Sequence, residues 1–377
     1  MSTETMSELI PVTLSTGYLG SGKTTVLNRL VRQPEMADAL VIINEFGEMA
    51  LDHMLVAHST ENLVMAMDSG CVCCSIRGDL VKTLRDVTWR FSRNGHRQFE
   101  RLLIETTGLA DPAPIIHTLM THPQIASKYR LDGIVTTVDM ATGMKTLDQH
   151  QEAIKQAAMA DVLLLTKSDL VTDEQRDALL HRLNKLNPAA PHWQVRNGEI
   201  QARKILHLGL FTATGKMADV AHWLKEESYL SAAFVPVARP QSIGQRPLIL
   251  KPQSTHTRMA HSHDVNRHND HIHAFCFAID DPIPEETLAA WLEILMSFVG
   301  SNILRVKGIL NVEGNPLPVV IHGVQHIFHP PVTLPAWPSE DRRSRLVFIT
   351  HDVGKDVIEK TFHAFRQVSS RADEVPA

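Results

Sequence analysis

A glycine-rich segment near the amino terminus has the residue types that bind phosphate. Residues 17–24, G-Y-L-G-S-G-K-T, fit the pattern G-x-x-x-x-G-K-[ST] and lie between an apolar run and a helical pattern. Glycines let backbone N–H groups approach an anion, and the helix that follows points its positive end at the same place. The lysine is expected to neutralise the β- and γ-phosphates, and the threonine hydroxyl to bind Mg²⁺. We predict a nucleotide-phosphate site formed by Gly17, Gly20, Ser21, Gly22, Lys23, Thr24 and Thr25.

A second element, about 140 residues further along, indicates which base is bound. Thr166, Lys167, Ser168 and Asp169 follow an apolar run and resemble the [NT]-K-x-D element of GTPases. An aspartate at this place accepts hydrogen bonds from guanine N1–H and the N2 amine, a pair of donors that adenine lacks. The lysine stem is expected to cover the face of the ring. The threonine replaces the commoner asparagine, so we expect fewer hydrogen bonds to the neighbouring loop. The element favours GTP over ATP.

Acidic residues follow two other apolar runs. Glu105 begins E-x-x-G, a form that suits a γ-phosphate sensor, with Glu105 holding Mg²⁺ through water and the Gly108 N–H contacting the phosphate. Glu45 lies where a first switch loop is expected, and it is a candidate for positioning water or binding a metal. An ordinary strand-to-loop turn and a solvated loop acid are the structural alternatives. The candidate catalytic residues are Lys23, Glu45 and Glu105.

Three of the four cysteines, Cys71, Cys73 and Cys74, form a C-x-C-C cluster that cannot serve as a conventional disulfide framework. Thiolates suit soft or borderline ions such as Zn²⁺. Three ligands leave one position open, which favours a transfer or sensing site over a closed structural one. A redox centre and buried apolar cysteines are the alternatives. Reduced thiols predict a cytoplasmic protein.

Histidine is concentrated in one stretch of the chain. Neutral imidazole is the commonest metal ligand near pH 7, so this stretch can collect Zn²⁺, Ni²⁺ or Co²⁺. A polar loop with no metal role is the alternative. The six histidines, taken as auxiliary metal ligands, are His256, His261, His263, His268, His271 and His273.

The order of apolar and helical segments must place these residues in space. Over the first 170 residues it predicts an α/β fold, a doubly wound, mostly parallel sheet covered by helices, whose strand ends carry the ligand sites. A helix is expected over Thr172 to Leu186, capped by Thr172. The expected strands are Ile10–Ser15, Ala39–Ile43, Leu63–Met67, Arg101–Glu105, Gly133–Val138 and Asp161–Leu165.

A smaller α+β domain is predicted at the carboxyl terminus, in the order strand, helix, three strands, helix. We divide the chain into a P-loop domain at residues 1–225, a polar, histidine-rich linker or insertion at 226–270, and this last domain at 271–377. Its expected elements are Ile272–Ile279, Pro284–Val299, Leu304–Val312, Leu317–Gly323, Arg345–Thr350 and Lys355–Phe365.

Composition narrows the class of partner. The chain has 377 residues, a net charge of −5, 44% apolar residues and 21% charged residues, which are typical of a globular protein. The absence of a basic excess argues against general nucleic-acid binding. We expect no membrane span, and the polar start, Met1 to Glu8, predicts no secretion signal.

Together these motifs resemble the CobW-type GTPases of the CobW/HypB/UreG class of P-loop metallochaperones. The resemblance implies slow GTP hydrolysis and a metal held at the C-x-C-C cysteines under nucleotide control. Members of the class serve zinc homeostasis, cobalamin synthesis or metalloenzyme maturation. The chain departs from the pattern at Asp68 and Ser69 and in the long insertion. The motifs that carry the resemblance are residues 17–25, 45–48, 70–80, 105–112 and 166–169, and the last domain resembles the family's carboxyl-terminal domain.

The function expected from these residues is delivery of zinc to a client metalloprotein, driven by GTP. GTP, Mg²⁺ and Zn²⁺ are the expected cofactors, with Co²⁺ left open. The alternatives are a GTP-gated zinc store or sensor, a cobalt-handling protein of cobalamin synthesis, and a small-molecule kinase. A nucleotide-dependent homodimer also stays open.

Overall fold

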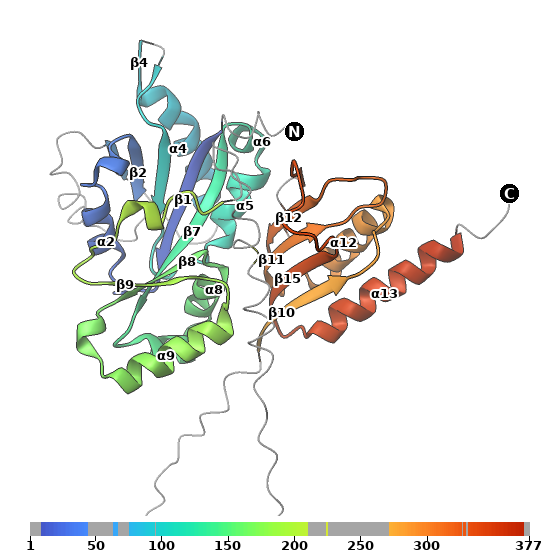
Figure 1. The fold of residues 1–377 in the computed structure, drawn as a ribbon. Coiled ribbons are helices and arrows are strands. Elements are labelled where there is room, and N and C mark those ends of the chain that lie inside the picture. Colours follow the sequence, from blue (N-terminus) through green and yellow to red (C-terminus); the bar gives the residue numbers. More distant parts are fainter. Residues whose placement is uncertain are drawn as a thin grey trace, which may run out of the picture.

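The structure is a computed structural model that describes residues 9–43, 63–66, 75–94, 96–209, 224, 271–325, 327–328 and 331–372. It contains a large parallel sheet in the amino-terminal part of the chain and a smaller antiparallel sheet in the carboxyl-terminal part (Figure 1). The predicted boundaries at 225 and 270 fall at or within residues 225–270, outside the described residues, and stay predictions.

Seven strands form the parallel sheet in the order β3-β2-β6-β1-β7-β8-β9. All of these pairings are parallel, so the carboxyl ends of the seven strands lie at one edge of the sheet. The predicted α/β class is confirmed. The strands are β1 Ile10–Gly17, β2 Ala39–Ile43, β3 Leu63–Ala66, β6 Arg101–Glu105, β7 Tyr129–Asp139, β8 Val162–Thr166 and β9 His192–Val195.

Apolar clusters cover both faces of this sheet, as β2 illustrates. Leu40 and Ile42 pack in the cluster that includes α4, α5 and α8, whereas Val41 and Ile43 pack in the cluster that includes α2. Successive side chains of a strand point to opposite faces, so a run of five apolar residues is what burial on both faces requires. The helices are α2 Lys23–Leu30, α4 Ser75–Arg90, α5 Ala113–Thr121, α6 Pro123–Ala126, α7 Gly143–Gln149, α8 Gln151–Met159 and α9 Asp173–Leu186.

Short elements complete this half of the molecule. A two-stranded hairpin pairs β4 (Ser92–Arg93) with β5 (His96–Arg97). Three 3₁₀ turns are η1 (Pro34–Met36), η2 (Ser168–Leu170) and η3 (Ala202–Lys204).

The carboxyl-terminal sheet is antiparallel, with the order β10-β15-β11-β12-β13 and with β14 paired to β12. Trp291 and Phe362, from its two helices, are buried with their rings 5.1 Å apart. The predicted α+β domain is confirmed. Its elements are β10 Ile272–Ile279, α12 Glu285–Val299, β11 Ile303–Leu310, β12 Val319–Val324, β13 Ile327–Phe328, β14 Val332–Thr333, β15 Ser344–His351 and α13 Lys355–Ala372.

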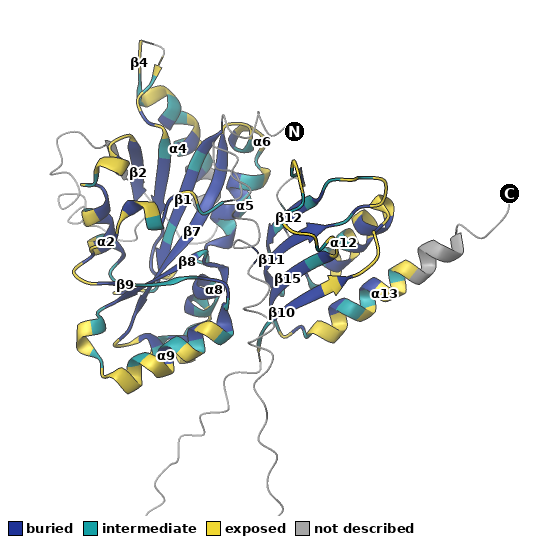
Figure 2. Ribbon diagram, viewed as in Figure 1, coloured by how far each residue is buried: buried dark blue, intermediate teal, exposed yellow. Residues whose placement is uncertain are grey.

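The two parts share an apolar core. Leu304, Val347 and Ile349 of the antiparallel sheet belong to the same cluster as Ile116 of α5 and Ala157 of α8. Figure 2 shows buried residues continuing from the parallel sheet through α8 into β11 and β15, with exposed residues on the outer sides of α9 and α13. The interface is therefore a packed surface and not a loose tether.

Several predicted limits of strands and helices are confirmed, and the one that differs most has a physical cause. The strands at 39–43, 101–105 and 272–279 are confirmed, as is the Thr172 cap, which accepts a hydrogen bond from Gln175 N. The strand predicted at 133–138 begins earlier, at Tyr129, because Arg130 and Asp132 are buried as an ion pair 3.2 Å apart. Charged residues conceal such a strand in the sequence. None of the helices described is long and apolar enough to span a bilayer.

Candidate functional site

The phosphate loop connects β1 to α2 at the carboxyl edge of the parallel sheet. Gly20 and Gly22 have φ angles of +72° and +90°, a region that favours glycine, and Gly22 is the N-cap of α2. Gly17 has no room for a side chain, because a Cβ there would lie 2.2 Å from Thr137 Oγ1. The three predicted glycines are thus required by backbone shape and by close packing.

Lys23 and Ser21 are fixed inside this loop. Lys23 is buried, and its Nζ donates to Gly17 O at 2.9 Å and to Tyr18 O at 3.3 Å. The Ser21 and Thr137 hydroxyl oxygens lie 2.6 Å apart. The lysine amine therefore lies across the loop that would enclose phosphate, whereas Thr25 is exposed on α2.

The loop after β6 meets the phosphate loop directly. Thr24 Oγ1 donates to Glu105 Oε1 at 3.1 Å, and Glu105 is buried at the end of its strand. A Cβ on Gly108 would lie 2.7 Å from the Leu19 N atom, so only glycine permits this approach. A hydroxyl beside a carboxylate is an oxygen donor set that suits Mg²⁺; Thr24 would be a direct ligand and Glu105 would act through water. The two residues predicted for Mg²⁺ are thus brought together.

The predicted base-binding element is built at the end of β8. Thr166 Oγ1 donates to Ser21 O at 2.7 Å, so the threonine does tie this element to the phosphate loop. Lys167 has a left-handed φ of +56°, and its Nζ lies 2.7 Å from Asp139 Oδ2. Asp169 lies in η2 with an exposed side chain, in a position open to a ligand.

Two residues that the sequence reasoning missed support this edge. Asp139, at the end of β7, holds Lys167 through one oxygen and accepts from Ala141 N at 2.8 Å through the other. Gln156, buried in α8, donates to Gly108 O at 3.3 Å and to Ala110 O at 2.9 Å. Asp139 has a sequence signal, an aspartate that ends an apolar run. Gln156 has none.

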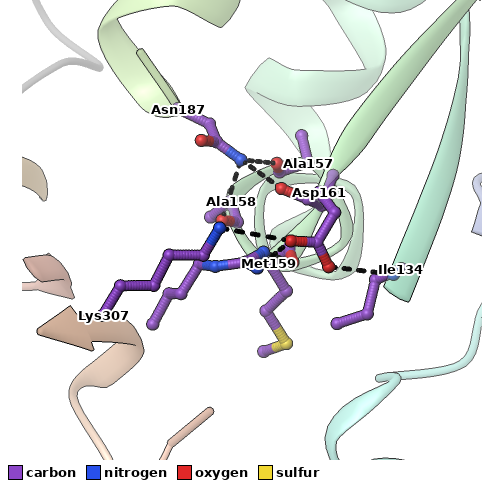
Figure 3. Close-up of polar contacts among 9 residues, drawn as sticks. Ile134, Ala157, Ala158, Met159, Asp161, Asn187 and Lys307 are labelled. Atoms are coloured by element: carbon purple, nitrogen blue, oxygen red, sulfur yellow. Dashed lines mark hydrogen bonds and ion pairs between the residues drawn. The ribbon is translucent and has the colours of Figure 1, made fainter. Parts of the chain in front are cut away.

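The carboxyl edge of the parallel sheet, which carries the phosphate loop, the loop after β6 and residues 166–169, is called the nucleotide edge below. Helix α8 links this edge to the carboxyl-terminal sheet. His150, its N-cap, stacks on Tyr18 of the phosphate loop with the rings 4.5 Å apart, and Gln156 holds the loop after β6. At the other end of the helix, Asn187 Nδ2 lies 2.9–3.1 Å from the carbonyls of residues 157, 158 and 160 (Figure 3). Arg305 of β11 donates to Met159 O.

Asp161, just after α8, is the charged centre of the interface. It pairs with Arg305 and with Lys307, whose Nζ lies 3.3 Å from Oδ1, and it accepts from Ile134 N at 3.0 Å (Figure 3). Burial alone would raise the pKa of this carboxyl. The Arg305 and Lys307 charges and the hydrogen bonds outweigh burial, so the pKa lies below its usual value.

Eight of the residues predicted to bind metal or to act in catalysis lie outside the described residues: Glu45, Cys71, Cys73, Cys74, His256, His261, His263 and His268. The two remaining histidines are described, and neither belongs to the nucleotide edge. His273 lies within β10 of the carboxyl-terminal sheet, and His271 lies just before that strand.

Comparisons with known proteins agree with this architecture. Residues 11–194 match the CobW/HypB/UreG nucleotide-binding domain, and residues 272–366 match the cobalamin synthesis protein CobW carboxyl-terminal domain. The chain is 30% identical over 359 residues to the zinc chaperone YjiA of Escherichia coli, covering 95% of this chain and 99% of the relative. It is 26% identical to a zinc chaperone CobW of Sinorhizobium over 94% of this chain and 97% of the relative.

A solved structure shares the fold. The crystal structure of Zn(II)-bound YjiA GTPase from E. coli has a TM-score of 0.62 at 24% identity, over 95% of this chain and 99% of that one. The phosphate loop, the Thr24–Glu105 contact and the base-binding element fit the nucleotide-binding domain that the match names. This chain belongs to the CobW/HypB/UreG family of P-loop GTPases and carries the CobW carboxyl-terminal domain.

Proposed function

We propose that this GTPase binds zinc at Cys71, Cys73 and Cys74 and delivers it to a client metalloprotein under the control of the bound nucleotide. The names of its relatives support the choice of metal, because two are zinc chaperones and another, from Dictyostelium discoideum, is a zinc-regulated GTPase metalloprotein activator. Such a chaperone would act in the cytoplasm, where thiols stay reduced.

One observation carries this proposal: the phosphate loop and the loop after β6 touch each other at the nucleotide edge. Thr24 contacts Glu105 at 3.1 Å, and Gly108 packs against Leu19. A γ-phosphate bound here would contact both loops, so its loss on hydrolysis would release both. Mg²⁺, when bound, would neutralise phosphate charge. The chain itself supplies Lys23 to hold the phosphates.

The order of strands supports coupling to the cysteines. Cys71 follows the last residue of β3 by five positions, and Glu45 follows the last residue of β2 by two. Strands β3 and β2 are parallel to β6 and β1, so all four end at the same edge of the sheet. Three thiolates leave one metal position for a ligand from the client.

Metal affinity in the two nucleotide states tests the proposal. We expect Zn²⁺ to bind more tightly with Mg²⁺ and a GTP analogue than with GDP, measured by competition with a chelating dye. Linkage requires metal to tighten the GTP analogue by the same factor, typically about 5–150-fold. Replacing Cys71, Cys73 and Cys74 by serine should remove the coupling and spare nucleotide binding. Equal metal affinities in the two states would contradict the switch.

Delivery needs a second measurement, because the histidine-rich segment favours a competing function, a GTP-gated zinc store or sensor. A delivery enzyme should transfer zinc to an acceptor in step with GTP hydrolysis, and Lys23→Ala, which removes the phosphate-binding amine, should stop both. A store would release zinc to the acceptor at the same rate in the variant. Shortening residues 256–273 should lower zinc stoichiometry or loading rate and leave the coupling intact.

Cobalt handling is the other candidate, favoured by the match to the cobalamin synthesis carboxyl-terminal domain. Repeating the titration with Co²⁺ distinguishes the two. A nucleotide-dependent change of Co²⁺ affinity larger than that of Zn²⁺ would favour cobalt. Light scattering in the two nucleotide states would test for a homodimer.

A further inference from the structure

Three metal-binding side chains meet in the carboxyl-terminal sheet, apart from the nucleotide edge. Strands β10 and β15 are antiparallel, and their register pairs Ile272 with His351. The residues just beyond that pair, His271 and Asp352, are therefore adjacent although 81 positions separate them. Candidate ligand atoms of His271, His351 and Asp352 all lie within 4.8 Å of one another.

The carboxylate lies between the two imidazoles. Asp352 Oδ1 is 2.5 Å from His271 Nδ1, and Asp352 Oδ2 is 2.8 Å from His351 Nδ1. The two rings stack, with centroids 5.7 Å apart and planes 15° from parallel. Hydrogen bonding to His271, together with the charges of the nearby histidines, lowers the pKa of the Asp352 carboxyl below its usual value.

Backbone contacts fix this arrangement. Asp352 N donates to His271 O at 2.6 Å, and His351 N donates to Asn302 O at 2.7 Å. Asn302 Nδ2 returns a hydrogen bond to His351 O at 2.9 Å. Asp352 has a left-handed φ of +58°, a conformation that aspartate and asparagine adopt more readily than most residues. The cluster is thus held on both strands and is not a chance meeting of side chains.

The donor set suits a borderline divalent ion. Zinc in proteins takes imidazole nitrogen at about 2.0–2.1 Å and carboxylate oxygen at about 2.0–2.2 Å, which places ligand atoms of a tetrahedron about 3.3 Å apart. The candidate ligand atoms lie within 4.8 Å of one another, so side-chain rotation would have to close a gap of at most about 1.5 Å when an ion binds. The side chains are 60%, 31% and 49% exposed in chain order, so an ion can reach them from solvent. Three protein ligands leave a fourth position for exchange.

We propose that His271, His351 and Asp352 form a zinc-binding site, separate from the C-x-C-C cysteines, where the chain returns from the histidine-rich segment to the carboxyl-terminal sheet. Its open fourth position would allow the bound ion to exchange with another ligand. The competing explanation is a simple surface ion pair, in which protonated histidine and aspartate bind each other and no metal.

The test uses the full chain with the other candidate ligands removed. The parent variant has Cys71, Cys73 and Cys74 changed to serine and His256, His261, His263, His268 and His273 changed to alanine. We expect this parent to bind one Co²⁺, detected by its visible absorption, and expect Zn²⁺ to displace it in competition with a chelating dye. An unchanged visible spectrum on adding Co²⁺ would overturn the proposal.

Single substitutions in the parent assign the ion to these residues. His351→Ala and Asp352→Asn should each weaken Zn²⁺ at least about tenfold. Asparagine keeps the left-handed backbone and removes only the carboxylate charge. His181→Ala, at an exposed histidine on α9, is the matched control and should leave the affinity unchanged. Equal losses in all three variants, or none in the first two, would refute the site.

The same samples show whether each variant is folded and whether the proposed zinc site is independent of the cysteines. Thermal unfolding and GDP binding should match the parent in every variant, so that a lost ion cannot be ascribed to a lost fold. The parent lacks the cysteines, so failure of this site would leave the nucleotide-controlled cysteine proposal intact.

Discussion

The two ends of strand β8 differ in how far their charged side chains are buried. At its amino end, Asp161 is 7% exposed and is enclosed by Arg305, Lys307 and the Ile134 N–H group. At its carboxyl end, Lys167 is 40% exposed and Asp169 is open to solvent. Five buried residues separate the two ends.

The difference follows from the cost of burying charge. A buried carboxylate is tolerated only when opposite charges and hydrogen bonds replace water, which leaves it no capacity for a ligand. The charges at the carboxyl end keep their hydration and can exchange water for a base. One end of the strand therefore joins the two sheets, and the other end is available for recognition.

The largest effect is expected on the free energy of unfolding, from a substitution at the buried amino end of β8. Asp161→Asn removes the charge opposite the buried Arg305 guanidinium, and breaking such a pair typically costs about 3–5 kcal/mol of unfolding free energy. Denaturant unfolding measures this loss. Asp148→Asn, at a pair with Arg182 in which the aspartate is 42% exposed, is the control and should change stability by less than about 1 kcal/mol. Similar losses of stability from the two substitutions would show that burial does not set the cost of losing the Asp161 charge.

The next largest effect is expected on GTP affinity, from a substitution near the carboxyl end of β8. Asp169→Asn should weaken GTP by about 100-fold or more, because an amide cannot accept both guanine donors, and should shift preference toward xanthine nucleotide. Competition against labelled GDP measures this change. Asp173→Asn, an exposed aspartate in the first turn of α9, should leave GTP affinity unchanged. Equal affinity of the unmodified protein for ATP and GTP would contradict the assignment.

A smaller loss of stability is expected from the cap of α8. Asn187→Ala removes the amide that bonds three buried carbonyls at the end of the helix, and we expect a loss of about 2 kcal/mol. Denaturant unfolding followed by circular dichroism measures it. An unchanged midpoint would mean that water replaces the amide.

Low pH should destabilise the fold by protonating Asp161 at the buried amino end of β8. The folded pKa of Asp161 lies below its unfolded value of about 3.9, so the carboxylate contributes stability that is fully present above that value. This stability is lost as the pH falls through the folded pKa. We expect unfolding free energy to decline below about pH 4, and to decline less in Asp161→Asn. Parallel acid profiles for the two proteins would assign the decline to other carboxyls.

The smallest effect is expected from the exposed lysine. Lys167→Met keeps the stem that would cover the base and removes the ammonium charge that pairs with Asp139, whose side chain is 8% exposed. GTP affinity should fall less than about tenfold. A loss as large as that of Asp169→Asn would mean that the lysine charge itself recognises the nucleotide.

Local chemistry allowed the nucleotide edge to be predicted. The phosphate loop, Glu105 with Gly108, and the element from Thr166 to Asp169 each lie within a few residues. Backbone conformations such as the left-handed Gly20 and Gly22 depend on the residue itself and its neighbours. The alternation of apolar runs with helical patterns likewise fixes the class of sheet.

The contacts between segments that are distant in the sequence depend on the tertiary packing of the chain. Asp161 meets Arg305 across 144 positions, and His271 meets Asp352 across 81. Gln156 looks like any polar residue of a helix until packing aims it at Gly108. No local pattern encodes such pairs, because strand register and the shared apolar core set which side chains become neighbours, and burial then decides whether their charges join the two sheets or stay available to a ligand.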